Sequence, residues 1–164
     1  MSARGLLDAV RVGPVRKQAQ DVVRLISDPK RCQVMLVTLA EETPVSEVVD
    51  TAFAVEDRAG VALGPVVING CFAPLPVPVS ANATAILDDA RVCDRFVSQR
   101  EADDLAHAAA FLDERRALQH EQIQRLRERL PLPQIELPFV FNPDITRPQL
   151  DTLADAFARG IEQL

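Results

Sequence analysis

Two short apolar segments, Gln33–Leu39 and Pro65–Asn69, are separated by an amphipathic stretch. Short aliphatic runs bounded by turn residues predict strands buried on both faces, as in a parallel sheet covered by helices. The stretch between them predicts a helix, with Thr43 as its cap, Pro44 at its first position and an end at Gly60. The apolar residues expected on one face of this helix are Val45, Val48, Val49, Ala52 and Phe53. We therefore expect a βαβ unit with a right-handed crossover.

Further elements are predicted on both sides of this unit. They are a helix from Gly13-Pro14 to Ile26, a helical stretch from about Thr84 to Leu130 with one or two breaks, a strand at Gln134–Pro138, and a helix from about Pro148 to Arg159 before Gly160. Ser98 and Glu101 have the spacing of a capping box. Alternate prolines in Gly70–Pro78 predict an extended loop that leaves the sheet.

This order of elements predicts an α/β fold with about three parallel strands flanked by helices. A long helical segment is expected between the second and third strands. Residues 1–12 are expected to be a weakly structured extension, and residues 13–164 to form one α/β domain.

Composition narrows the classes of function. Apolar residues make up 48% and charged residues 26% of the 164 residues, as in an ordinary globular protein. The net charge of −6 and the lack of Trp and Tyr argue against nucleic-acid binding. No run of 18 apolar residues is present, and residues 1–12 lack the apolar stretch of a secretory signal. Three cysteines without a CxxC spacing favour a reducing, cytoplasmic location.

The chain contains no motif that specifies catalysis on its own. His107 and His120 lack further ligands at metal spacing, and Cys71 has no basic neighbour, so we expect no metal site and a small buried thiol. Acidic and basic residues alternate along the second half of the long helix, where Glu121 and Arg125 have a favourable spacing. We expect a solvated, self-paired face there, and no catalytic residues.

Glu41 follows the first predicted strand of the βαβ unit, and Asn69 ends the second. Because the carboxyl ends of parallel strands meet at one rim, where ligands bind in open α/β sheets, both residues are candidates for ligand contacts. Side chains of these types at strand ends also cap neighbouring helices. Both interpretations stay open from the residues alone.

Four segments in this order carry a resemblance to a known family: Gly13–Ile26, Val37–Glu41, Pro65–Asn69 and Ile135–Pro138. Together they resemble the carboxyl-terminal half of ArsA-type anion-transporting ATPases, which belong to the deviant-Walker P-loop class with the tail-anchored-protein targeting ATPase. The resemblance covers roughly residues 13–157. It implies that the fold is half of a P-loop NTPase-like parallel sheet.

The resemblance also implies a nucleotide site. Glu41 and Asn69 match the positions of nucleotide contacts in the family, and Pro138 with Phe139 matches the position that walls the adenine pocket. The implied cofactor is ATP. The complete family couples ATP hydrolysis to anion transport or protein targeting, which implies a peripheral contact with a membrane transporter for a complete protein.

The chain departs from the family in its catalytic parts. It has no GxxxxGK[ST] loop and no deviant Lys-Gly-Gly form, which in the family lie upstream of the matched region together with the catalytic Asp. We therefore expect a fragment or a truncated relative that does not hydrolyse ATP alone. Mg²⁺ is expected to bind only if the missing P-loop half is supplied.

Two functional hypotheses follow. The first is the nucleotide-base-binding half of an ArsA-like ATPase, and the second is a non-catalytic interaction or oligomerisation module derived from that fold. In the family, the P-loop strand lies beside this half, so one edge of the sheet is expected to be bare. The chain is then a homo-oligomer or binds a partner that carries the Walker half.

Overall fold

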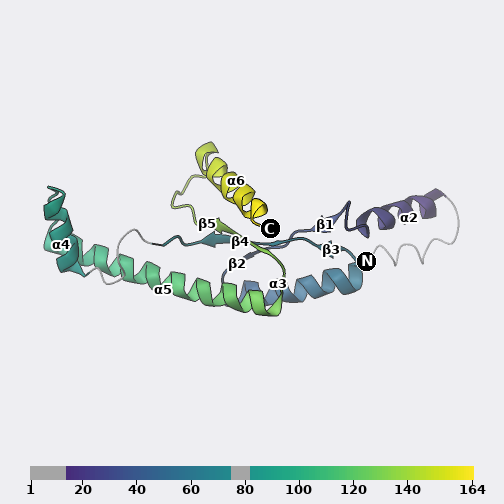
Figure 1. The fold of residues 1–164 in the computed structure, drawn as a ribbon, viewed down its shortest axis with the longest axis horizontal. Coiled ribbons are helices and arrows are strands. Elements are labelled where there is room, and N and C mark those ends of the chain that lie inside the picture. The colour runs from purple at the N-terminus through teal and green to yellow at the C-terminus, as the bar shows by residue number, and fades with distance from the viewer. Residues whose placement is uncertain (1–13, 75–81) are drawn as a thin grey trace.

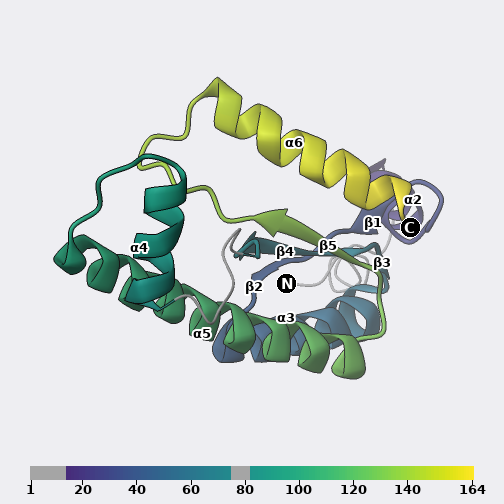
Figure 2. The same cartoon turned by 60° about the vertical axis from the view of Figure 1, so that its left-hand side comes forward.

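The computed structural model describes residues 14–74 and 82–164 and has a mixed α/β fold (Figures 1 and 2). The elements in chain order are α2 (Pro14–Ile26), β1 (Gln33–Val34), β2 (Val37–Leu39), α3 (Glu42–Ala54), the π-helical turn η1 (Val55–Ala59), β3 (Ala62–Leu63), β4 (Val66–Cys71), α4 (Ala83–Val92), α5 (Gln99–Arg129), β5 (Gln134–Pro138) and α6 (Arg147–Glu162). The predicted extension 1–12 lies outside the described residues, as does the end of the predicted loop, 75–78.

The main sheet has three parallel strands in the order β2-β4-β5, as the sequence predicts, and β1 and β3 form a separate parallel pair. The first predicted strand is therefore interrupted, which is a correction. Val34 pairs with Leu63 and Val37 pairs with Val67. Between these two pairs, the segment from Leu63 to Val67 therefore contains one residue more than the segment from Val34 to Val37. Pro65 lies in the longer segment, and its missing N–H leaves a gap in the ladder.

Helices cover the two faces of the main sheet unequally (Figure 2). On one face, α3 and α5 pack against the sheet and enclose the hydrophobic core, in which Ile68 and Leu126 are fully buried. On the other face, α6 packs against β5. The side chains of Val37 and Leu39 on β2 are 66% and 42% exposed. The face opposite the core is thus closed at β5 and open at β2.

The βαβ helix begins two residues earlier than predicted. Glu41, not Thr43, is in the N-cap position, and Pro44 lies inside the first turn of α3. Backbone N–H groups of the first turn have no intrahelical acceptor, so a proline is tolerated at any of these positions. Gly60 ends the helical stretch with φ 65°, as predicted. Phe53 is 52% exposed and does not join the buried face, because it lies about 100° around the helix axis from Ala52.

The stretch 83–129, which precedes β5, is helical with one break, as predicted. Ser98 and Glu101 form the expected capping box at the start of α5. The hydrogen bonds from the Ser98 side chain and backbone lower the pKa of the Glu101 carboxyl. The 31-residue α5 runs beneath the sheet and beyond it to α4 (Figure 1).

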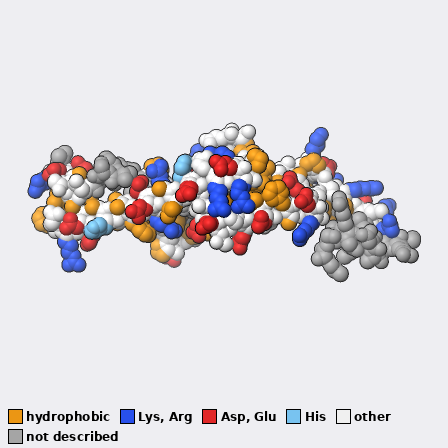
Figure 3. Space-filling view, turned by 90° about the horizontal axis from the view of Figure 1, so that it is seen from below, with side chains coloured by type: hydrophobic (Ala, Val, Ile, Leu, Met, Phe, Trp, Pro, Cys, Tyr) orange, Lys and Arg blue, Asp and Glu red, His pale blue; other side chains and the backbone are white. Residues whose placement is uncertain are grey.

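Charged side chains of both signs are interspersed over the outer face formed by α3 and α5 (Figure 3). Arg125 forms an ion pair with Glu42 of α3 at 3.7 Å rather than the predicted pair within its own helix. Arg129 donates to the Ser46 hydroxyl of α3 at 3.4 Å. These residues link α5 to α3 at the surface.

The last helix does not end at Gly160, which is a second correction. α6 continues to Glu162, and Gly160 lies against Ile135 of β5. A Cβ atom at residue 160 would lie 2.5 Å from the Ile135 Cγ2 atom. The glycine therefore permits a close approach of helix and strand. Across the described residues, no helix has the length and apolar character required to cross a membrane.

Candidate functional site

The predicted site residues lie where the strands of the main sheet end. Glu41 follows β2 after one residue and is exposed at the N-cap of α3. Asn69 is exposed on β4 opposite Leu39, the last residue of β2. It does not end its strand as predicted, because β4 continues to Cys71, which still pairs with Pro138, the last residue of β5. Because the three strands are parallel, these residues belong to the same rim.

A bulge shapes this rim at the end of the central strand. Ile68 is opposite Glu136 and Cys71 is opposite Pro138, so β4 advances three residues while β5 advances two. Gly70 lies in the bulge with φ 74°, a conformation that favours glycine. A bulge at a sheet edge redirects the following residues. Here it directs Phe72 into the region beyond the strand ends.

Gln119 of α5 fixes the redirected chain. Its Nε2 group donates to the Gly70 carbonyl at 2.9 Å, and its Oε1 atom accepts from the Phe72 N–H at 2.8 Å. The side-chain amide thereby pairs with β4 as a neighbouring peptide group would. The last residue of β4 that pairs with β2 is Asn69, so this amide satisfies backbone groups beyond the end of the shorter strand.

Three phenylalanine rings cluster at the same rim. The ring centroid of Phe72 is 4.9 Å from that of Phe139 and 5.9 Å from that of Phe141, and the latter two are 4.8 Å apart. These are favourable tilted and edge arrangements. The Phe139 and Phe141 side chains are 44% and 71% exposed, so the cluster presents aromatic surface to solvent.

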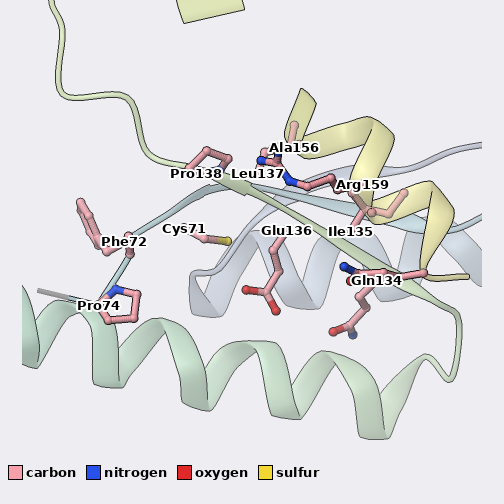
Figure 4. A pocket seen from close by; sticks show the side chains of 13 residues that line it. Cys71, Phe72, Pro74, Gln134, Ile135, Glu136, Leu137, Pro138, Ala156 and Arg159 are labelled. Carbon is pink, nitrogen blue, oxygen red and sulfur yellow. The ribbon is translucent and has the colours of Figure 1, made fainter. Parts of the chain in front are cut away.

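A cavity of about 490 Å³ extends from this cluster along β5 to α6 (Figure 4). Its lining includes Phe72, Pro138 and, from α6, Arg159. In Figure 4, Glu136 points from β5 toward α5, on the side away from α6. Cavities of this size hold small organic ligands in other proteins.

A second cavity, of about 530 Å³, lies between α5 and the ends of β4 and β5. Asp113, Arg116 and His120 of α5 line it together with Glu136, so it carries charges of both signs. His107 and His120 are both exposed. Within residues 14–74 and 82–164, no group of three or more His, Cys, Asp or Glu side chains is placed to hold a metal ion.

Cys71 is buried between these two cavities, in agreement with the prediction of a small buried thiol. Its Sγ atom donates to the Ile68 carbonyl at 3.5 Å. Burial, and to a smaller extent the nearby Glu136 carboxylate, raises the pKa of the Cys71 thiol from 9.0 to about 11. The thiol is therefore protonated and a weak nucleophile at neutral pH.

The four predicted site residues do not share one cavity. Pro138 lines the cavity beside the phenylalanine cluster, to which Phe139 belongs. Asn69 lines a different hollow, a groove of about 370 Å³ between β2 and α3. Glu41 lines none of these three spaces. Pro138 and Phe139 therefore lie together at the rim, whereas Asn69 of β4 lines the groove on the β2 side.

Sequence reasoning missed the residues that complete the rim, namely Phe72, Gln119, Phe141 and Arg159. Phe141 had a signal, because two phenylalanines separated by one residue follow the third strand in a chain with only seven aromatic residues. Gln119 had none, since it is one of several glutamines in a polar helix. A scan against protein-family models finds no match, and a search of curated proteins finds no significant similarity.

Proposed function

We propose that the chain binds the base of an adenine nucleotide at the rim formed by Pro138 and Phe139, as the non-catalytic half of an ArsA-like nucleotide-binding assembly. The observation that carries this proposal is the exposed phenylalanine cluster beside Pro138, at the edge of a cavity of about 490 Å³. Aromatic faces stack on nucleobases and contribute about 1–3 kcal/mol per base.

Phosphate contributes little to this binding. Among the described residues, Arg159 is the one cation that lines the cavity, and the sequence has no glycine-rich loop to hold a phosphate chain. Affinity then depends on the base, and we expect a Kd no better than about 1 mM. ATP hydrolysis, Mg²⁺ binding and any coupling to anion transport or protein targeting require a partner that supplies the P-loop.

The test is an NMR titration of the isotope-labelled chain with AMP. We expect the earliest and largest shifts at Phe139 and at the neighbouring Phe72, because Asn69 lines a different groove and Glu41 lines none of these cavities. Ribose 5-phosphate, which lacks the base, should leave the Phe139 signals unchanged. If it shifts them as AMP does, the chain recognises phosphate and base binding is wrong.

A matched pair of variants localises the site. Phe139→Leu removes the aromatic face at the rim and should weaken AMP binding severalfold. Phe96→Leu is the control, because Phe96 is 94% exposed at the junction of α4 and α5. Equal effects of the two variants, or shifts confined to α5, would refute the proposed pocket.

A further inference from the structure

We propose that the groove between β2 and α3 binds an extended, lysine- or arginine-bearing segment of another polypeptide, which adds to the sheet as a strand beside β2. This inference goes beyond base binding, because the groove is a different surface from the cavity at Pro138. Strand addition to an exposed sheet edge is a common mode of peptide recognition.

The first observation is that β2 offers a free edge. The strand order is β2-β4-β5, so β2 has a partner on one side only among the described strands. The Val67 N–H of β4 donates to the Leu36 carbonyl at 2.8 Å, and Thr38 is opposite Ile68. Backbone groups alternate in direction along a strand, so the N–H and C=O groups of Val37 and Leu39 point away from β4.

The second observation is that the groove runs along this edge. Four consecutive residues, 36–39, line it from one side, and Pro44, Glu47, Val48 and Thr51 of α3 line it from the other. The α3 residues follow the three- and four-residue spacing of one helix face. A strand placed beside β2 would therefore have a helix face under one set of its side chains and the open sheet face beside the other set.

These two surroundings define the side chains of the occupant. Val37 and Leu39 are exposed on the open face, so the neighbouring side chains of the added strand should be apolar. On the α3 side, Glu47 is the charged residue among the described residues that line the groove, and α3 carries no Lys or Arg. A segment with alternating apolar and basic residues matches both surroundings.

A second copy of this chain fits less well. Two copies joined through β2 by a twofold axis perpendicular to the sheet would place their α3 helices on the same face, next to each other. Glu47 of one copy would then approach Glu47 of the other. Like charges across such a contact disfavour association, whereas a basic segment is attracted.

The experiment uses the whole chain and synthetic peptides of about six residues, the length of a typical strand. One peptide alternates valine and lysine, one alternates valine and glutamate, and a third is the lysine peptide with N-methyl groups that remove its strand hydrogen bonds. We expect the lysine peptide to bind with a Kd of about 10–100 μM and the other two at least tenfold more weakly. Amide shifts should centre on Val37, Leu39, Glu47 and Thr51.

Variants separate strand addition from simple charge attraction. Val37→Pro removes an outward N–H and keeps the ladder to β4, so it should weaken the lysine peptide at least tenfold while the spectrum stays folded. Glu47→Lys should reverse the preference toward the glutamate peptide. Glu114→Lys, the same charge change on the exposed surface of α5, is the matched control and should leave the preference unchanged.

Three outcomes would overturn the proposal. Equal binding of the lysine peptide to wild type and to both groove variants would show attraction to net charge alone. Shifts centred at Phe139 would place the peptide at the rim and not in the groove. Self-association that Val37→Pro abolishes, with no effect of peptide, would make a second copy the occupant. None of these results changes the response of the rim to AMP, so base binding is tested separately.

Discussion

Replacement of Gln119 by methionine should destabilise the protein, because this side chain holds the end of β4 in place. The variant keeps a similar side-chain volume and loses both hydrogen bonds, to the Gly70 carbonyl at 2.9 Å and from the Phe72 N–H at 2.8 Å. Each such bond contributes about 1 kcal/mol net, and a partly buried backbone group left without a partner costs about 1–3 kcal/mol.

We therefore expect the free energy of unfolding to fall by about 2 kcal/mol, with a decrease in Tm of roughly 4–8 °C for a chain of this size. Urea unfolding followed by circular dichroism gives the first quantity, and calorimetry the second. The Phe72 amide should also lose protection from hydrogen exchange. This local effect distinguishes loss of the two Gln119 hydrogen bonds from a general weakening of α5.

Gln122→Met is the matched control, because it makes the same change less than one turn further along the same helix. The Gln122 Oε1 atom is buried and has no hydrogen-bond partner among the described residues. Removal of that atom should leave stability unchanged or raise it. Equal decreases in the free energy of unfolding for the two variants, or a decrease below about 0.5 kcal/mol for Gln119→Met, would refute the stabilising role of the Gln119 hydrogen bonds.

Three further predictions concern the packing of α6, the buried thiol of Cys71 and ATP hydrolysis. Gly160→Ala should lower Tm despite the better helix propensity of alanine, because its Cβ would meet Ile135 at 2.5 Å, and the double variant with Ile135→Ala should lose less than the two single changes added together. Iodoacetamide should modify the exposed Cys93 at neutral pH and Cys71 only as the pH approaches about 11. Thermal stability should fall between pH 9 and 11, because the Cys71 thiol releases its proton at a lower pH in the unfolded chain than in the folded one. The purified chain should release no phosphate from ATP, since the sequence has no P-loop; turnover that survives removal of contaminating enzymes would contradict this.

The elements of the fold were predictable where local patterns determine them. β5 was predicted with both of its ends correct, and the Ser98–Glu101 capping box was predicted because both partners lie within four residues of each other. The split of the first strand into β1 and β2 was not, because it depends on Pro65 in a different segment. The predicted helix end before Gly160 was wrong for the same reason, because this glycine permits close contact with Ile135 of another segment and does not end the helix.

The candidate site was predictable only in part. Parallel strands bring their carboxyl ends to one rim, so Glu41 and Asn69 could be assigned to that edge from their order alone, whereas Pro138 was a candidate only through the family resemblance. Asn69 and Pro138 line different cavities because β2 and β5 lie on opposite sides of β4, and the end of β4 between them is shaped by the bulge at Gly70 and by a hydrogen bond from Gln119, 49 residues away in the sequence. A long-range contact of one glutamine side chain leaves no periodic pattern in a single sequence.

Intermolecular NOEs between AMP and the labelled chain test the central claim most directly, because they report distances from the base to individual side chains. Base binding at the rim predicts NOEs from the adenine H2 and H8 protons to the rings of Phe139 and Phe72 and to the Pro138 side chain. NOEs from these protons to α5 or to the β2–α3 groove, with none to Phe139, would contradict it.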